Sequence, residues 1–146
     1  MSGDMCATTE KKVLDHLVGK TTYTFAADAC YVGLCTNATP GDPTMATPGT
    51  WTELTIGSNG YTRQQITGAN WVAATQSGTG PATSASGTGV TFTNTTSDWG
   101  AVYGWGLFTA ASAGTQLFWG TLSSSVTMHV GDSLQITTGN LTVTLQ

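Results

Sequence analysis

Apolar and polar residues alternate over much of the chain, which is the pattern of a β-strand with one buried face. The alternation is clearest over residues 126–130, 134–136 and 141–145, and a glycine-containing turn separates each of these runs from the next. Similar short runs recur from residue 29 onward. The sequence therefore predicts a mainly β protein, an antiparallel β-sandwich or jelly roll of roughly 8–10 strands with one short N-terminal α-helix.

The one helical pattern lies near the N-terminus. Residues 9–18 carry an apolar stripe at positions i, i+1, i+4 and i+5, formed by Val13, Leu14, Leu17 and Val18. A threonine just before the stripe can cap the helix, and the glycine after it suits a left-handed end. A helix of roughly ten residues is marginal by itself in water, so we expect it to dock on its own domain or on a neighbour.

The chain is expected to divide at the end of this helix. The residues before the helix show no periodicity, so residues 1–19 are interpreted as an arm and a docking helix. Residues 20–146 are expected to form a single β-sandwich domain that stays folded without them. Two segments rich in turn-forming residues, 37–50 and 76–89, are expected to be long loops within that domain.

Charged residues make up only 8% of the chain, whereas aromatic residues make up 9%. Low charge with ordinary aromatic content argues against disorder. The four Lys and Arg residues are too few to neutralise a phosphate backbone, which argues against a nucleic-acid partner. No apolar run approaches the roughly 18 residues of a membrane helix, and the N-terminus lacks the apolar stretch of a signal peptide. The sequence thus predicts no membrane association.

Arg63 is the only cation after residue 20. A single cation in a weakly charged β-domain is expected to form an ion pair, and the candidate partners are Asp28, Glu53 and Asp98. The pair is expected either within the domain or across a contact between subunits.

The three cysteines do not predict a disulfide or a metal site. Cys30 and Cys35 are expected on one strand with side chains on opposite faces, too far apart for a bond that needs Cα atoms within about 7 Å. We expect all three thiols to be small buried or half-buried apolar groups, with a bond from Cys6 to another chain as the alternative. Neither histidine has ligand-like spacing to them, so no metal and no other cofactor is expected.

Catalytic residues are not expected. His16 lies on the helix beside apolar neighbours, and no nucleophile-elbow motif accompanies it. His129 is expected to be an exposed strand histidine. Asp98 is the best of the few acids, but the sequence around it is also that of an ordinary turn before a strand. The chain is therefore predicted not to be an enzyme.

Tryptophans are the remaining candidates for ligand contact. Trp51 and Trp71 border the two predicted loops, and sugars stack on exposed aromatic rings, so both are candidates for a glycan or receptor surface. Packing in the core is the competing interpretation and the preferred one, more clearly for Trp105 and Trp119 than for Trp51 and Trp71.

Several segments that follow one another in a fixed order carry a family resemblance. They are Leu14-Asp15-His16-Leu17-Val18-Gly19, Tyr31-Val32-Gly33-Leu34-Cys35-Thr36, Gly60-Tyr61-Thr62-Arg63-Gln64, Val90-Thr91-Phe92 leading to Asp98-Trp99-Gly100, Gly106-Leu107-Phe108-Thr109-Ala110, and Gly131-Asp132-Ser133-Leu134 through Leu145. Their order and spacing resemble a family of small bacteriophage virion proteins commonly labelled "phage tail fiber protein". The enlarged loop at 37–50 departs from the pattern. The resemblance implies a compact β fold and a non-enzymatic virion component.

The expected role is that of a capsid decoration (cement) protein. A fibre that spans a distance normally has a long repetitive chain, whereas this one predicts a globule with a radius of gyration of about 15 Å. Such a protein, made in the host cytoplasm, would lie on the capsid exterior as a homotrimer bound to the major capsid protein. The contact residues would come from the helix: Lys11, Lys12, Val13, Leu14, Leu17 and Val18. The alternative is a tail-fibre or tail-tip protein that binds a host glycan or receptor through Trp51 and Trp71.

Overall fold

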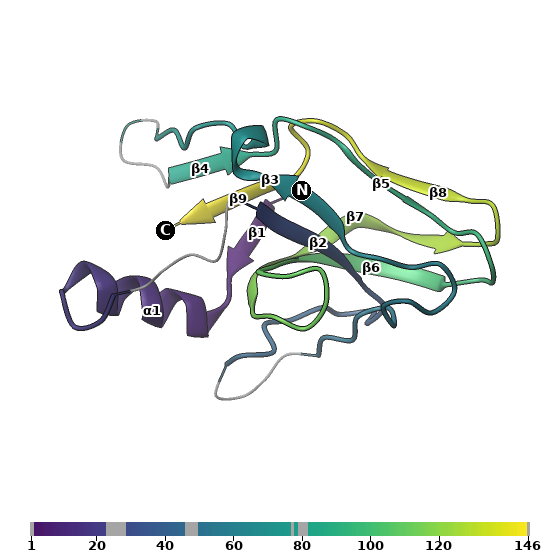
Figure 1. The fold of residues 1–146 in the computed structure, drawn as a ribbon, viewed down its shortest axis with the longest axis horizontal. Helices are drawn as coiled ribbons and strands as arrows, with labels where there is room; N and C mark the ends of the chain where they lie inside the picture. Colours follow the sequence, from purple (N-terminus) through teal and green to yellow (C-terminus); the bar gives the residue numbers. More distant parts are fainter. Residues whose placement is uncertain (1, 23–28, 46–49, 77, 79–81, 146) are drawn as a thin grey trace.

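Nine strands and one α-helix make up the part of the chain that the computed structural model describes, residues 2–22, 29–45, 50–76, 78 and 82–145 (Figure 1). In chain order they are β1 (Ser2–Met5), α1 (Ala7–Leu17), β2 (Ala29–Cys35), β3 (Gln64–Thr67), β4 (Ala82–Ala85), β5 (Val90–Thr93), β6 (Gly100–Phe108), β7 (Gln116–Met128), β8 (Ser133–Ile136) and β9 (Thr142–Leu145), with a 3-10 turn at Gly68–Asn70 after β3. The predicted mainly β class and short N-terminal helix are confirmed.

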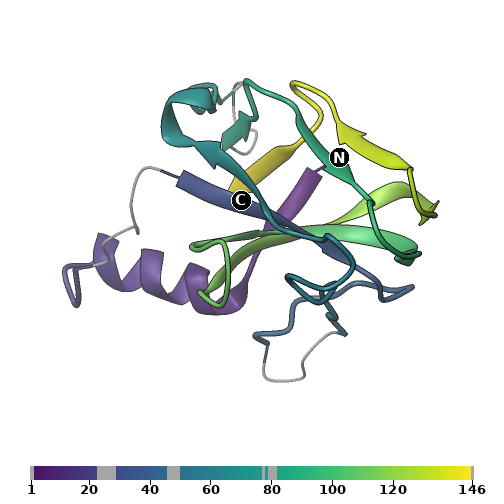
Figure 2. The same ribbon diagram turned by 45° about the vertical axis from the view of Figure 1, so that its right-hand side comes forward.

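Seven of the strands form one curled sheet, and the other two pack against it as a second layer (Figure 2). The strand order in the large sheet is β3-β2-β6-β7-β1-β9-β4, and the small sheet is β5-β8. Neighbouring strands are antiparallel except for β1 and β9, which run parallel. The architecture is therefore sandwich-like, with the first and last strands of the chain side by side.

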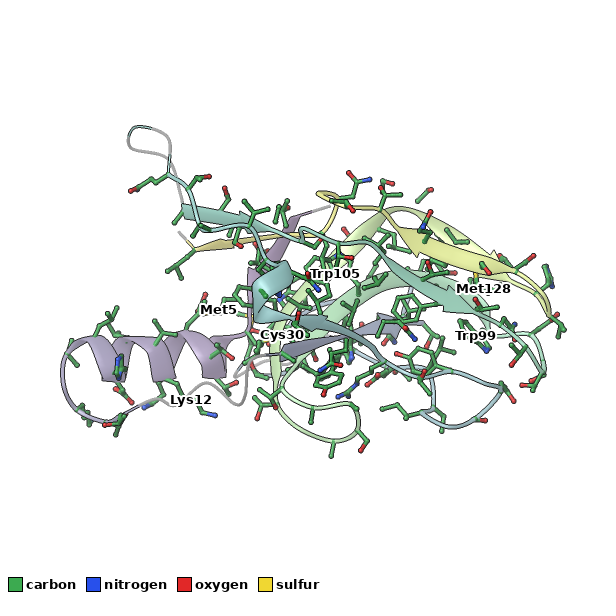
Figure 3. All side chains as sticks on the ribbon, turned by 45° about the horizontal axis from the view of Figure 1, so that its top comes forward. Met5, Lys12, Cys30, Trp99, Trp105 and Met128 are labelled. Carbon is green, nitrogen blue, oxygen red and sulfur yellow. The ribbon has the colours of Figure 1, made fainter. Side chains whose placement is uncertain are left out.

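The core lies between the two layers. Its largest fully buried side chains are Trp105, Tyr61 and Phe92, which come from β6, from the segment before β3 and from β5. Figure 3 shows Trp105 among the strands, far from the exposed turn beyond Met128. Core packing of Trp105 is confirmed, whereas Trp119 is half-buried.

Strand β6 is buried on both faces because Pro40, from the 37–50 segment, and Trp51, directly after it, cover the face that is turned away from the core. A Cβ at Gly104 would lie 2.8 Å from Cγ of Pro40, and one at Gly106 would lie 2.9 Å from Cζ2 of Trp51. The register between β6 and β7 shifts after Val102, as at a bulge. Glycine is needed at these two positions because another segment passes directly over the strand.

The expectation of an N-terminal arm is wrong. Residues 2–5 form β1, which lies inside the large sheet between β7 and β9. Gly3 pairs with Gly120 and with Val143, and its backbone passes directly over Trp105. Four residues of mixed polarity carry no strand pattern, and they are ordered by pairing with strands from the far end of the chain. The boundary after residue 19 therefore does not separate two independent units.

The prediction of one long loop at 76–89 is also corrected, because β4 lies within it and pairs with β9. Its sequence, Ala-Thr-Ser-Ala, has no large apolar residue to mark it as a strand. Residues 77 and 79–81 lie outside the described part of the chain. The 37–50 segment contains no regular strand in its described residues, as expected, and residues 46–49 lie outside them.

Candidate functional site

Helix α1 leaves the sheet directly after β1 and lies along one end of the molecule (Figures 1 and 2). Its first turn faces the domain, where Thr9 is buried. At the other end Gly19 has a φ of +72°, and the backbone amides of Lys20 and Thr21 donate hydrogen bonds to the carbonyl of Asp15. The glycine that was expected to end the helix therefore does so, in the left-handed conformation.

The apolar stripe of α1 is mostly exposed. Leu14 is 60% exposed, Leu17 is 74% and Val18 is 66%, whereas Val13 is half-buried. A helix of this length is stabilised in water mainly by burying its apolar face, and here most of that face has no cover among the described residues. Three of the apolar residues that the sequence assigned to a partner contact, Leu14, Leu17 and Val18, therefore lie together at the surface.

An open groove of about 710 Å³ runs along this face of α1. Strands β1 and β9 form its other wall, and its lining residues are Asp4, Met5, Glu10, Val13, Leu14, Leu17, Thr144 and Leu145. An adjoining hollow of about 280 Å³ shares Met5, Val13, Thr144 and Leu145 with it and extends to Leu117 and Phe118 of β7. Together they make one continuous, largely apolar depression beside the exposed leucines. We call this surface the α1 groove.

The two lysines of α1 lie outside this groove. Lys11 is exposed and forms an ion pair with Asp15, four residues later on the same helix. Lys12 and Met5 lie on opposite sides of α1 (Figure 3). The predicted contact set therefore divides into an apolar part that faces the groove and a charged part that borders it or faces away.

The start of α1 is held by a residue that sequence reasoning missed. Asp42, from the 37–50 segment, is 5% exposed, and its Oδ2 accepts a hydrogen bond from the backbone amide of Ala7 at 2.7 Å. Its Oδ1 accepts from the amide and the hydroxyl of Thr44, each at 2.7 Å. A carboxylate suits this place because helix N-termini carry unsatisfied amides and partial positive charge.

The expected threonine cap is therefore wrong. The N-cap residue is Cys6, which makes no side-chain capping bond. The only local signal in the sequence is that Asp42 begins an Asp-Pro-Thr turn. The amide that Asp42 binds, that of Ala7, lies 35 residues away in the sequence.

Cys6 is fully buried at the junction of β1 and α1. Burial raises the pKa of the Cys6 thiol to about 12, and the nearby negative charge of Asp42 adds to the effect. Cys30 and Cys35 are also free thiols, and burial raises the pKa of each. Cys6 and Cys35 are buried and Cys30 is half-buried, which confirms the interpretation of the cysteines as small buried or half-buried groups, and a bond from Cys6 to another chain does not fit its burial.

Arg63 pairs within the chain rather than across a subunit contact. Its Nε and Nη2 donate to Oε1 and Oε2 of Glu53, both at 2.7 Å, and its Nη1 donates to the carbonyls of Ala110 and Ala113. The guanidinium lies 3.5 Å from the ring centroid of Phe108, and the Arg63 side chain is 5% exposed. The guanidinium is thus fully engaged inside the domain, and the inter-subunit ion pair is corrected. Asp28, another expected partner, lies outside the described residues.

Tyr61 extends this network into the core. Its hydroxyl donates to Oε1 of Glu53 at 2.9 Å and accepts from the amide of Leu34 at 2.8 Å. Burial and the charge of Glu53 raise the pKa of Tyr61, so its hydroxyl stays protonated. The ion pair is therefore tied to β2 and holds together segments that are distant in the sequence.

The two candidate glycan-binding tryptophans are packed. Trp51 is half-buried, with its ring centroid 6.3 Å from that of Phe108, and Trp71 packs against the core cluster. Packing, the competing interpretation, accounts for the position of both side chains. Glycan binding through Trp51 and Trp71 stays a prediction.

Asp98 and His129 hold a surface turn. Oδ2 of Asp98 lies 2.9 Å from Nδ1 of His129, and its Oδ1 accepts from the amide of Val130. The hydrogen bond from Asp98 raises the pKa of His129, and the same bond lowers the pKa of Asp98. Both side chains are more than half exposed, so the pair braces a turn at the surface.

The described residues hold neither a metal site nor a membrane-spanning helix. No three His, Cys, Asp or Glu side chains in this part of the chain gather as ligands for a metal ion. None of its helices has the length and apolar character needed to cross a bilayer.

Comparison with known proteins identifies the family. A family model described as "Podophage GP4 fiber I protein gp80" matches residues 4–144, which takes in α1 and nearly all of both sheets. No curated protein matches the chain significantly. The match confirms the resemblance to phage virion proteins that carry a fibre label. Because it spans almost the whole length, the chain belongs to the podophage GP4 fiber I protein gp80 family.

Proposed function

We propose that this chain is a non-enzymatic structural subunit of a phage fibre and that it is held in the virion through the α1 groove. The assignment to a phage fibre, and so to the virion, rests on the family description. The observation that supports the attachment site is the exposure of Leu14, Leu17 and Val18 on one short helix. Contiguous exposed apolar surface on a small protein marks an interaction site.

The arrangement of ionisable groups supports a structural role. Arg63 and Glu53 hold two loops to β2, Asp42 caps α1, and Asp98 with His129 braces a turn. Each of these groups stabilises a chain segment. None of them needs a substrate to complete its hydrogen bonds.

Capsid decoration on the major capsid protein lattice is the second candidate. The observation that favours it is the shape of the domain, a two-layer globule whose first and last strands pair with each other. Such a unit can cap a site on a shell, and it does not extend along an axis as a fibre shaft does. We prefer the fibre because the family description names one.

The attachment site can be tested in virions of the phage that encodes the chain. A Leu14→Asp/Leu17→Asp variant is expected to fold but to be missing from purified particles, because two charges on the apolar stripe block burial against a partner. Val130→Asp is the matched control, since Val130 is also about half exposed but lies on the turn after β7. Normal incorporation of the double variant would contradict the proposal.

Copy number separates the two candidate locations. Quantitative mass spectrometry of virions is expected to find at most a few dozen copies if the chain is a fibre subunit. Several hundred copies, with immunogold label over the head, would instead show decoration.

A further inference from the structure

We propose that the edge of β7 beyond Gly120 binds an extended segment of a neighbouring virion chain. The segment pairs with β7 as an added strand and places apolar side chains, at alternate positions, in the groove between β7 and β8. This inference goes beyond the proposed attachment through α1, because it concerns a different surface. It is carried by the strand pairing, by the groove, and by the uncharged residues that form both.

β7 has strand neighbours on both sides over only part of its length. β6 pairs with β7 from Gln116 to Met128, whereas β1 pairs only with residues 118–120. Among the described residues, the stretch 121–127 therefore has a strand neighbour on one side alone. The outer edge of such a strand can pair with any extended chain that approaches it, because its backbone amides and carbonyls already have the right spacing.

The open edge of β7 borders a groove of about 590 Å³ between the two sheets. Residues 121–124 and Val126 line it on β7, and residues 134–137, from β8 and the position after it, also line it. We call this surface the β7–β8 groove. β8 pairs with β5 and with no other strand of the described chain. The groove therefore lies between two strand edges, where pairing does not join the two layers.

The β7–β8 groove lies far from the proposed attachment site. In both ribbon views β8 is at the end of the molecule away from α1 (Figures 1 and 2). A chain that is held through the α1 groove therefore still presents the β7–β8 groove to a neighbour.

An added strand would continue the pairing that β1 already makes with β7. Gly3 pairs with Gly120 in antiparallel register, so the line of β1 before Ser2 runs along the edge formed by residues 121–127. Gly3 also faces Trp105 in the core, and every second position along the same line faces the core as well. The existing pairing therefore specifies the direction of the added strand and the face of each of its side chains.

The lining of the groove calls for apolar side chains on the inward face of the added strand. Leu122 and Val126 are half-buried and pack against the core, and so does Leu134 of β8. Ser124 lines the groove between Leu122 and Val126, and it is exposed. A small side chain between larger apolar ones leaves space that an apolar side chain of the added strand can fill.

The edge carries none of the charges or prolines that usually prevent strand addition. Residues 121–127 read Thr-Leu-Ser-Ser-Ser-Val-Thr, and no ionisable residue lines the β7–β8 groove. The bulge in β7 is formed against β6, on the other side of the strand. The edge is therefore suited to an extended partner segment whose inward side chains are uncharged.

The first test adds the strand to the chain itself. The sequence Val-Thr-Val-Thr-Val-Thr is placed directly before Met1, after a new initiating methionine, so that its valines share the inward face of Gly3. The control, Thr-Val-Thr-Val-Thr-Val, has the same composition but turns its valines outward, because a shift of one residue exchanges the two faces of a strand.

Only the in-phase chain is expected to gain from the added strand. It should unfold at a temperature several degrees higher than the wild type, and the amides of residues 121–127 should exchange about tenfold or more slowly in hydrogen–deuterium exchange. The out-of-phase chain should match the wild type in both measurements. If neither fused chain folds, the second test decides.

The second test measures amide exchange in assembled virions. Residues 121–127 of the wild-type chain are expected to exchange about tenfold or more slowly in the particle than in the purified chain. Ser124→Lys places a charge in the groove and should abolish this protection or remove the chain from the particle. Ser125→Lys is the matched control and should keep the protection, because Ser125 is equally exposed but does not line the groove.

Three results would overturn the inference. They are equal exchange of residues 121–127 in the virion and in the purified chain, equal effects of Ser124→Lys and Ser125→Lys, and equal stabilisation by both phases of the added strand. Protection in the virion without an effect of phase would show an occupant that is not a strand. Failure of the proposed function is read separately, from normal incorporation of the Leu14→Asp/Leu17→Asp chain, and it leaves these results unchanged.

Discussion

Arg63 and Glu53 form a two-point ion pair inside the domain, with two nitrogen–oxygen distances of 2.7 Å. The Arg63 side chain is 5% exposed and that of Glu53 is 16% exposed, so water reaches the pair only at its margin. The same guanidinium lies over the ring of Phe108 and binds the carbonyls of Ala110 and Ala113. Arg63, the only Lys or Arg after residue 20, thus holds the loop between β6 and β7 against the domain.

Breaking this pair should destabilise the domain strongly. Arg63→Met leaves the Glu53 carboxylate largely buried without its partner, and we expect a loss of about 3–5 kcal/mol in the free energy of unfolding. Arg63→Lys, which keeps the charge but not the two-point geometry, should lose less. Denaturant unfolding of each variant gives the values. In an Arg63→Met/Glu53→Gln double variant the loss should be smaller than the sum of the single losses, and strict additivity would contradict the coupling.

Asp42 should control the order of the first turn of α1. Asp42→Ala removes the acceptor for the Ala7 amide, and caps of this kind contribute about 1 kcal/mol. Amide exchange at residues 7–10 is expected to become faster, as measured by hydrogen–deuterium exchange. Asp42→Asn keeps one acceptor oxygen and should behave between the wild type and Asp42→Ala. Equal exchange in all three chains would show that Asp42 does not cap α1.

Gly3 tests whether the N-terminus is part of the sheet. A Cβ there would lie 2.3 Å from Cη2 of Trp105 and 2.7 Å from the carbonyl oxygen of Trp119. Because the Trp105 ring is fully buried and cannot move aside freely, we expect Gly3→Ala to cost about 1–3 kcal/mol in thermal or denaturant unfolding. Asp4→Ala, at the next and exposed position of β1, is the control. If Gly3→Ala proved as stable as Asp4→Ala, β1 would not lie where the structure places it.

The pair of Asp98 and His129 predicts a pH dependence. The raised pKa of His129 means that its contribution to stability is fully present below its unfolded pKa of about 6.5 and is lost as the pH rises through the folded value. The lowered pKa of Asp98 means that its contribution is present above about 3.9 and is lost as the pH falls through the folded value. The pair therefore stabilises the turn most between these two limits.

Titration of the His129 ring by NMR is the direct measurement. Its midpoint is expected above about 6.5 in the wild type and nearer to that value in Asp98→Asn. Because both side chains are well exposed, the accompanying change in stability should be small. An unchanged His129 midpoint in Asp98→Asn would contradict the pairing.

Some elements could be predicted from the sequence because their signal is local. β5 and β8 show the alternation of buried and exposed residues that their apolar patterns predict. Helix α1 has its stripe and its glycine end within a dozen residues. β1 and β4 could not be predicted in the same way, since neither Ser-Gly-Asp-Met nor Ala-Thr-Ser-Ala has an apolar period. β1 is a strand because it pairs with β7 and β9, and β4 is a strand because it pairs with β9.

The predicted contact residues of α1 show the same difference between what a local pattern predicts and what distant packing decides. The sequence predicted correctly that Leu14 and Leu17 belong to one apolar stripe, because helical spacing alone puts them on one face. It left open whether the stripe would be buried in the domain. The structure shows that α1 leaves the sheet directly after β1, so its first turn and Val13 face the domain whereas Leu14 and Leu17 lie at the surface.

By itself, then, the sequence determined the β class, the helix with its stripe, and the weakly charged surface, since periodicity and composition are properties of neighbouring residues. Only the tertiary structure decided that the N-terminus is a strand, that Asp42 caps α1, that Arg63 closes on Glu53 within one chain, and that the stripe faces outward beside a groove. The physical reason is sequence separation. The bond from Asp42 to Ala7 spans 35 residues and that from Arg63 to Ala110 spans 47, and such contacts are made by whichever segments the packed sheets bring together.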